Sequence, residues 1–234
     1  TSFRRGCDRW SLLGEDDSRR ERPFRFQFGR DSCCTREVSV SAATDKPRSL
    51  IADKMLSMLP VLTERLRLRR MDSRDGARFA EYRSDSSVAI YQSWSSMTVA
   101  DAHAFISEQS RIGIGQYDEW FQLAIADRAS DDLIGDIGIC IRSPGDVAEI
   151  GFSLAPEAQG QGYATEACRA AIHFVFSLRA VQVIEAVIDA RNDAAIRLVK
   201  RLRMEFVRTE QSDFKGEVCL EHHFACERGS GRAG

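Results

Sequence analysis

The residues best suited to chemistry lie in one short stretch, 149–164, which reads E-I-G-F-S-L-A-P-E-A-Q-G-Q-G-Y-A. An apolar strand is predicted to end at Pro156, because proline cannot donate to a sheet ladder. Gly160 and Gly162 let the backbone turn tightly and approach a ligand closely. Apolar residues at steps of three and four then predict a helix from Ala164. Since a helix N-terminus offers unpaired N–H groups and a positive dipole end, this loop predicts a phosphate or pyrophosphate site.

The glycine pattern narrows the kind of phosphate ligand. The chain contains no G-x-x-x-x-G-K-[ST] loop and no G-x-G-x-x-G after a strand, which excludes the two commonest nucleotide loops. What remains is Gln159-x-x-Gly162-x-Ala164. It resembles the acyl-CoA pyrophosphate loop of the GNAT (Gcn5-related) N-acetyltransferases, whose pattern is Q/R-x-x-G-x-G/A. A generic strand–loop–helix, with glycines that serve only the turn, is the alternative for the loop alone.

Four further segments resemble the same family, in the family's order. Leu62–Arg69 is similar to the opening strand of the branch that acetylates ribosomal-protein N-termini, the RimJ/RimL type. Leu133–Ile139 resembles the third strand, and Val183–Asn192 resembles the fifth strand with its terminal asparagine. Ala195–Phe206 resembles the helix and turn that follow. The resemblance covers about residues 61–227.

The resemblance and the hydrophobic periodicity predict an α+β fold: a three-layer α/β/α mixed sheet with helices on both faces. In the first strand we expect Leu62, Leu66 and Leu68 to point inward. Asp72 is a candidate helix cap, and Thr98 with Asp101 forms a capping box. Strands are expected over 62–69, 120–126, 133–141, 147–154, 181–190, 204–212 and 217–226, and helices over 72–83, from 98 onward, over 164–178 and over 194–202.

The resemblance implies that acetyl-CoA is the co-substrate and that it lies against the 147–154 strand. Backbone groups of that strand would pair with the pantetheine arm, the loop would hold the pyrophosphate, and Asn192 would bond the pantetheine side. A second role for Asn192 is a helix N-cap, and both roles can hold together. The residues expected to bind the cofactor are Phe152, Ser153, Leu154, Gln159, Gly160, Gln161, Gly162, Tyr163, Ala164 and Asn192.

The reaction that the resemblance implies is attack of a neutral primary amine on a thioester. Deprotonating a lysine-type amine at pH 7 costs roughly 4.6 kcal/mol, whereas an α-amine costs only about 1 kcal/mol. Glu149 is the candidate general base, because the family places a catalytic glutamate near the start of this strand. By alternation it shares a face with Gly151 and Ser153, whose small side chains leave room for a substrate. An exposed carboxylate at a strand edge is the alternative.

No general acid is evident. Val199 stands where many GNAT enzymes have tyrosine, Ala195 stands where the ribosomal branch often has serine, and Arg203 replaces a usual glycine. A non-catalytic acyl-CoA-binding or sensing module is therefore the alternative to an N-acetyltransferase acting on a protein α-amine or a small-molecule amine. Tyr91, Trp94 and Trp120 are candidates either to contact the acceptor or to pack in the core.

Composition limits the partners. No run of 18 apolar residues exists, so no membrane span is expected. Residues 1–54 hold 12 Lys/Arg and 9 Asp/Glu, a net charge of +3. Because the whole chain has a net charge of −2, the remaining residues carry a net charge of −5. No basic nucleic-acid footprint is therefore expected there. The seven cysteines include no C-x-x-C pair, which indicates neither a zinc site nor a disulfide framework and favours a reducing, cytoplasmic setting.

The domain organisation follows from a change in composition near residue 55. Residues 1–54 are rich in Arg and Ser and lack sustained periodicity, so we expect a disordered extension, with a regulatory tail as the alternative. We expect the acetyltransferase-like domain over 55–228 and a flexible tail over 229–234. A monomer or a homodimer is expected.

Overall fold

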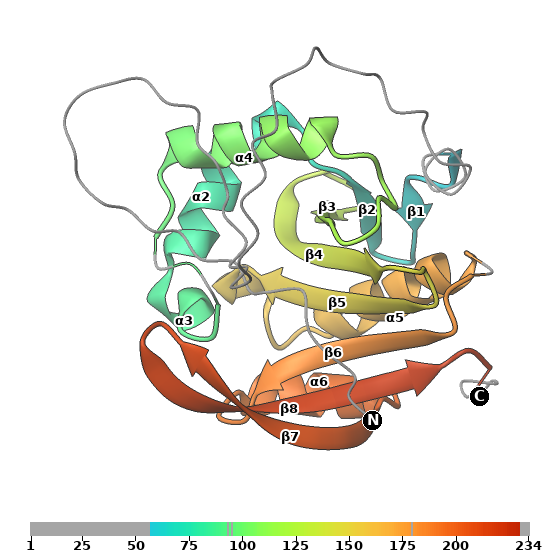
Figure 1. Ribbon diagram of the computed structural model, residues 1–234. Helices are drawn as coiled ribbons and strands as arrows, with labels where there is room; N and C mark the ends of the chain where they lie inside the picture. Colours follow the sequence, from blue (N-terminus) through green and yellow to red (C-terminus); the bar gives the residue numbers. More distant parts are fainter. Residues whose placement is uncertain (1–56, 93, 95, 179, 230–234) are drawn as a thin grey trace, which may run out of the picture.

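The computed structural model describes residues 57–229, apart from 93, 95 and 179. The predicted extension 1–54 and all but the first residue of the predicted tail lie outside this range. The described strands form one mixed sheet in the order β1-β2-β3-β4-β5-β6-β8-β7 (Figure 1). The strands are β1 (Val61–Leu62), β2 (Leu66–Arg70), β3 (Trp120–Asp127), β4 (Leu133–Arg142), β5 (Val147–Leu154), β6 (Val183–Asp189), β7 (Glu205–Phe214) and β8 (Glu217–Glu227).

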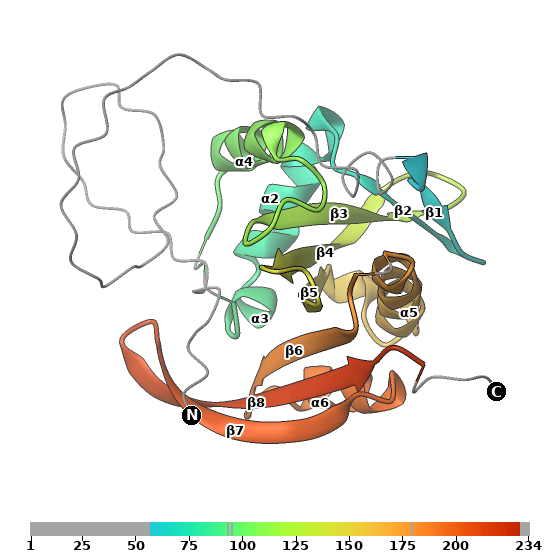
Figure 2. The ribbon, with the colours of Figure 1, turned by 45° about the vertical axis from the view of Figure 1, so that its right-hand side comes forward.

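Helices cover both faces of the sheet, which confirms the predicted three-layer α+β architecture (Figure 2). One layer holds α5 and α6, and the other holds α2, α3 and α4. The helices are α2 (Gly76–Ser84), α3 (Ser86–Ala89), α4 (Val99–Arg111), α5 (Tyr163–Phe176) and α6 (Asp193–Arg201), with short 3-10 turns at Ser73–Asp75 and Pro156–Ala158.

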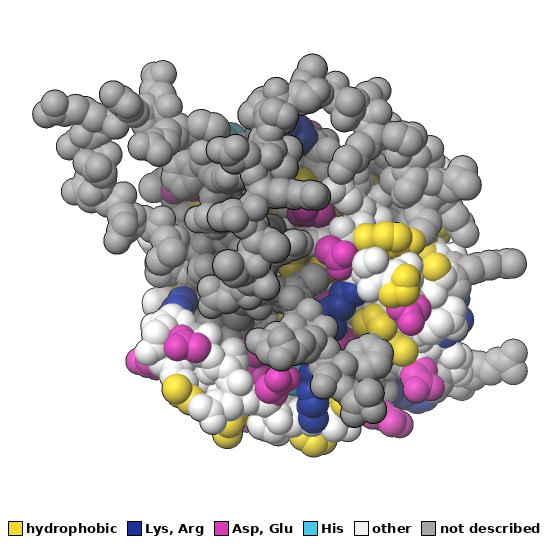
Figure 3. Space-filling view, in the orientation of Figure 1, with side chains coloured by type: hydrophobic (Ala, Val, Ile, Leu, Met, Phe, Trp, Pro, Cys, Tyr) yellow, Lys and Arg dark blue, Asp and Glu magenta, His cyan; other side chains and the backbone are white. Residues whose placement is uncertain are grey.

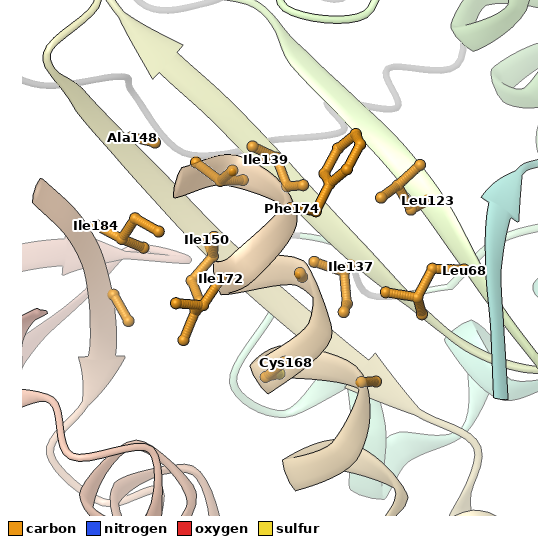
Figure 4. Packing of buried hydrophobic residues seen from close by; sticks show 14 of the residues in the cluster. Leu68, Leu123, Ile137, Ile139, Ala148, Ile150, Cys168, Ile172, Phe174 and Ile184 are labelled. Atoms are coloured by element: carbon orange, nitrogen blue, oxygen red, sulfur yellow. The ribbon is translucent and has the colours of Figure 1, made fainter. Parts of the chain in front are cut away.

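The main core lies between α5 and the middle of the sheet (Figure 4). Cys168, Ala171 and Val175 are buried and recur at steps of three and four, so they lie on one face of α5. They pack against the apolar faces of the strands, including Ile137 of β4 and Ile150 of β5. This packing fixes the position of α5, and of the loop that leads into it, relative to β5.

The sheet opens into a fork between β5 and β6. Residues 147–149 of β5 pair in parallel with residues 183–185 of β6, and the register stops there. On its other side β5 pairs with β4 along its whole length, from Val147 to Leu154. Backbone groups of Ile150–Leu154 that point toward β6 therefore lack a ladder partner on that side. We call this open edge the β5–β6 fork.

The opening strand differs from its prediction. The structure divides it into β1 and β2, which pair antiparallel, and Leu62 is 51% exposed rather than buried. The turn between them closes because the Leu66 N–H donates to Thr63 Oγ1, while the Thr63 N–H donates to the Leu66 carbonyl. Leu66 and Leu68 are buried as predicted.

Helix starts follow local capping chemistry. Thr98 and Asp101 form the reciprocal capping box predicted for α4. Asp72 also caps, but it caps the 3-10 turn at Ser73–Asp75, and α2 begins only at Gly76. The short helix α3, which no prediction covered, begins because Asp85 accepts from the Ser87 N–H.

The surface is mixed in charge on the side that Figure 3 shows. Acidic and basic side chains lie interspersed over the part of that face that is coloured by type. Among the described residues, no helix is both long enough and apolar enough to span a membrane.

Candidate active site

A cleft of about 1420 Å³ runs along β5, α5 and α6 and reaches α3 and the β1–β2 turn. The structure brings nine of the ten predicted cofactor residues to its walls. Gln161 does not line it, because its side chain turns back to donate to the Glu157 carbonyl. The nine are Phe152, Ser153, Leu154, Gln159, Gly160, Gly162, Tyr163, Ala164 and Asn192.

The open edge of β5 faces this cleft. Phe152, Ser153 and Leu154 all line the cleft and all lie beyond the last β5–β6 pair at Glu149. A linear ligand with amide groups can pair with the free backbone there, as a strand would. Pairing of a pantetheine arm with this edge, which the resemblance implies, stays a prediction.

The glycine loop leads directly into α5. Gly162 is the N-cap residue, with φ of 82°, a left-handed conformation that favours glycine. No side chain caps the helix, so the N–H groups of its first turn stay available to a ligand. Gln159 stabilises the loop by donating to the Leu154 carbonyl over 3.1 Å.

Arg65, which no sequence motif indicated, bonds the backbone of this loop from the β1–β2 turn. Its Nη1 donates to the Gln161 carbonyl over 3.0 Å, and its Nε donates to Glu166 Oε2 over 2.7 Å. Its guanidinium carbon lies 4.4 Å from the centre of the Tyr163 ring. Thr63 completes the clamp by donating to Glu166 Oε1 over 2.6 Å.

These contacts place charge near the proposed pyrophosphate site. Arg65 Nη2 lies 3.5 Å from where a Cβ on Gly162 would be. Glu166 sits in the first turn of α5, and Arg65 and Thr63 hold its pKa below the usual range against the opposing effect of burial. The carboxylate is thus ionised and paired, which limits its repulsion of an anionic ligand.

Glu149 lies at the point where the fork begins, but it does not line the cleft. Its side chain is 13% exposed and bonds the Arg142 guanidinium, which also donates to Glu185 over 2.9 Å. Burial raises the pKa of Glu149 above its usual range, while Arg142 opposes that rise. A raised pKa makes a carboxylate a stronger base, provided that it remains ionised. The role of Glu149 as the general base stays a prediction.

Asn192 occupies the N-cap of α6. Its Oδ1 accepts from the Ala195 N–H over 3.0 Å, which confirms the capping role. Its side chain also lines the cleft, and its Nδ2 makes no hydrogen bond to any described residue. Capping and contact with a ligand are therefore compatible, and the contact stays a prediction.

Of the three aromatic candidates, only Tyr91 lines the cleft. Its hydroxyl donates to the Arg191 carbonyl over 3.2 Å, next to Asn192. Trp94 is buried and donates to the Arg83 carbonyl over 2.9 Å, with the Arg83 guanidinium stacked 3.8 Å from its ring centre. Trp120 is 8% exposed and packs over Gly138.

Comparison with known proteins agrees with this geometry. The acetyltransferase (GNAT) domain model matches residues 65–205. The uncharacterised N-acetyltransferase YnaD of Bacillus subtilis is 31% identical over 144 residues, which cover 62% of this chain and 81% of YnaD.

Solved structures share the fold. A GNAT-family acetyltransferase from Bacillus anthracis superposes with a TM-score of 0.64 at 22% identity, over 71% of this chain and 97% of that one. RimL, described as a ribosomal L7/L12 alpha-N-protein acetyltransferase in complex with coenzyme A, superposes with a TM-score of 0.63 at 14% identity, over 72% and 97%.

The family match supports an enzyme rather than a non-catalytic binding module. It spans most of the described domain, including the glycine loop, β5 and Asn192. This chain belongs to the GNAT acetyltransferase family, and it is an acetyltransferase that uses acetyl-CoA.

Proposed function

We propose that this protein transfers the acetyl group of acetyl-CoA to a primary amine of low pKa, and that a protein N-terminal α-amine is the preferred acceptor. The amine nitrogen attacks the thioester carbonyl, the C–S bond breaks, and the leaving thiolate takes up a proton. The observation that carries the acceptor proposal is Glu149, a largely buried carboxylate of raised pKa at the start of the fork.

Glu149 would accept the proton that the attacking amine loses. The family's usual acids are replaced by Val199 and Ala195, both buried and unable to donate from their side chains. An α-amine needs only about 1 kcal/mol for deprotonation at pH 7, against roughly 4.6 kcal/mol for a lysine-type amine. A site with a general base and no evident general acid suits the α-amine, because that amine is the easier of the two to deprotonate. The description of RimL as an alpha-N-protein acetyltransferase adds support from a fold neighbour.

Acetyl-CoA would be held in three places. Phe152–Leu154 would pair with the pantetheine arm, residues 159–164 would bind the pyrophosphate, and Asn192 would bond the pantetheine side. A reducing, cytoplasmic setting is supported by the free thiols of Cys140, Cys168 and Cys219, all buried. The state of assembly is proposed to be a monomer or a homodimer.

An amine panel tests this proposal. The protein is incubated with acetyl-CoA and three acceptors: a peptide with a free N-terminus, the same peptide with a blocked N-terminus and one free lysine, and a small primary amine. Products are identified by mass spectrometry, because the protein's own thiols interfere with thiol reagents. We expect acetylation of the free N-terminus first. Preferred acetylation of the lysine would overturn the acceptor proposal.

A further inference from the structure

A second group of cationic side chains lines the cleft beyond the glycine loop. Arg169 and His173 stand one turn apart on α5, and Arg197 and Arg201 stand one turn apart on α6. We propose that the three arginines form a subsite for a phosphomonoester, the 3′-phosphate of coenzyme A, with His173 beside them. This inference rests on the proposed binding of the pyrophosphate at residues 159–164.

No described residue compensates the charges of these arginines. Neither Arg169, Arg197 nor Arg201 forms an ion pair or a side-chain hydrogen bond with a described residue, and all three are exposed. Arg65 on the same cleft behaves differently, since it is paired with Glu166. Cations that share a wall without a counter-charge repel one another, and an anion between them removes that repulsion.

The cleft is positive although the chain as a whole is not. Four arginines line it against two glutamates, Glu64 and Glu166, whereas the whole chain has a net charge of −2. Positive charge is therefore concentrated at this cleft. A multiply charged anion is the ligand that such a cleft attracts.

The spacing matches the nucleotide end of coenzyme A. Arg169 follows Tyr163 by six residues, which is about 9 Å along a helix. The pyrophosphate and the 3′-phosphate of coenzyme A are separated by one ribose, so a ligand anchored at the loop carries its second phosphate only a short way along α5. Arg197 and Arg201 of α6 lie on the same side of the sheet as α5 and face the same cleft.

The chemistry favours a phosphomonoester. Guanidinium groups donate paired hydrogen bonds that match the geometry of phosphate oxygens, and such charge-assisted bonds are stronger than neutral ones. The subsite would make this enzyme select donors that carry the full 3′-phosphorylated nucleotide. A donor that consists only of an acetylated phosphopantetheine arm has no 3′-phosphate and would not contact the three arginines.

The test compares acetyl-CoA with acetyl-3′-dephospho-CoA. For the wild type we expect KM for the dephospho donor to be about 10- to 100-fold higher, with similar kcat. In the Arg197→Gln/Arg201→Gln variant, KM for acetyl-CoA should rise toward that of the dephospho donor, whose own KM should change little. Arg169→Gln should show the same effect in smaller measure. Lys200→Gln is the matched control, since Lys200 is an exposed cation on α6 that does not line the cleft.

Two outcomes would overturn the subsite. One is equal KM for both donors in the wild type. The other is a rise in KM by the same factor for both donors in the double variant, which would indicate a general loss of positive charge. Calorimetric binding of CoA and 3′-dephospho-CoA gives the same comparison without an acceptor. If no amine is acetylated but CoA still binds more tightly than dephospho-CoA, the acceptor proposal fails and the subsite stands.

Discussion

Glu149 shares the Arg142 guanidinium with Glu185 at the start of the fork. Burial raises the pKa of Glu149, Arg142 opposes that rise, and the charges of Glu185 and Glu221 add to it. Changing Glu149 to Gln removes the proton acceptor with little change in shape. We expect kcat to fall by about 10²–10⁴-fold, with KM for acetyl-CoA kept, because Glu149 does not line the cleft. Raising the pH toward 9 should rescue the variant more with an α-amine than with a lysine-type amine.

The pH profile separates a base from a structural carboxylate. A base must be ionised, so wild-type kcat should fall as the pH drops through the pKa of Glu149, which burial raises. Glu185 is the matched control: its charge raises the pKa of Glu149, so Glu185→Gln should shift this acid limb to lower pH while keeping kcat. A Glu149→Gln variant with the wild-type rate at every pH from 6 to 9 would show that Glu149 is only a structural partner of Arg142.

Arg65 is expected to position the pyrophosphate loop. Arg65→Gln removes the bonds to Gln161 and Glu166 together and leaves the Glu166 charge unpaired beside the ligand. We expect KM for acetyl-CoA to rise about 10-fold or more with little change in kcat. Arg65→Lys keeps the charge without the forked geometry, and Glu166→Gln removes the repulsive charge. If Arg65→Gln binds acetyl-CoA like the wild type, the clamp has no part in binding.

At the residue scale, the sequence located the loop and Asn192 because their chemistry depends on neighbours within a few positions. It did not locate Arg65, whose partners Gln161 and Glu166 lie about a hundred residues further along the chain. The Arg142–Glu149–Glu185 group was also missed. It spans three adjacent strands, and only the strand order β4-β5-β6 brings its members together.

At the scale of single elements, the end of α6 is under local strain. The Arg203 N–H bonds the Lys200 carbonyl and the Met204 N–H bonds the Val199 carbonyl, the pattern of a Schellman cap. Arg203 has φ of 60° at the position where this cap favours glycine. Arg203 replaces the family's usual glycine, so a residue with a Cβ occupies this left-handed position.

Arg203→Gly should therefore stabilise the fold. Removing the Cβ relieves about 1–2 kcal/mol of left-handed strain, and the added freedom of the unfolded chain offsets about 0.5–1 kcal/mol of it. We expect a net gain of about 0.5–1 kcal/mol, or roughly 1–4 °C in melting temperature. Arg203→Ala keeps a Cβ and should give no such gain. An unchanged or lower melting temperature for the glycine variant would contradict this account.

The glycine loop offers a second test at this scale. Gly162→Ala places a Cβ in a left-handed conformation, toward Arg65 and the proposed pyrophosphate site. Gly216→Ala is the matched control, because Gly216 has φ of 75° in the β7–β8 turn and nothing lies within 4 Å of its Cβ position. Both variants should lose about 1 kcal/mol of stability, but only Gly162→Ala should bind acetyl-CoA at least about 10-fold more weakly by calorimetry. Equal affinities would place the ligand elsewhere.

The apolar patterns predicted which segments form strands, but they did not predict that β5 and β6 separate into a fork. The runs at 147–154 and 181–190 both read as strands, and their pairing depends on the register and twist of the whole sheet. The sequence pattern likewise predicted one strand where the structure has the β1–β2 hairpin. The turn is closed by hydrogen bonds of the Thr63 side chain, and such bonds give no signal in the apolar pattern.

At the scale of the whole molecule, the described residues form both a main core and the walls of the cleft. The buried residues of the main core run from Leu66 to Phe224, with Met58 and Leu59 packed at its edge. Among residues 57–229, the first that lines the cleft is Met58. The order of family-like segments along the sequence predicts a single domain over 55–228, and these boundaries stay a prediction.

A chain beginning at Met55 should therefore keep the stability and the cofactor affinity of the full chain. It retains every described residue of the core and of the cleft walls. We expect the free energy of unfolding to change by less than about 0.5 kcal/mol, since no core contact among the described residues is lost. Thermal melting and acetyl-CoA calorimetry on both chains provide the measurement. A large drop in melting temperature would show that residues 1–54 pack on the domain. An unchanged melting temperature with an altered kcat would favour the alternative of a regulatory tail, because the tail would then act on turnover without contributing to the fold.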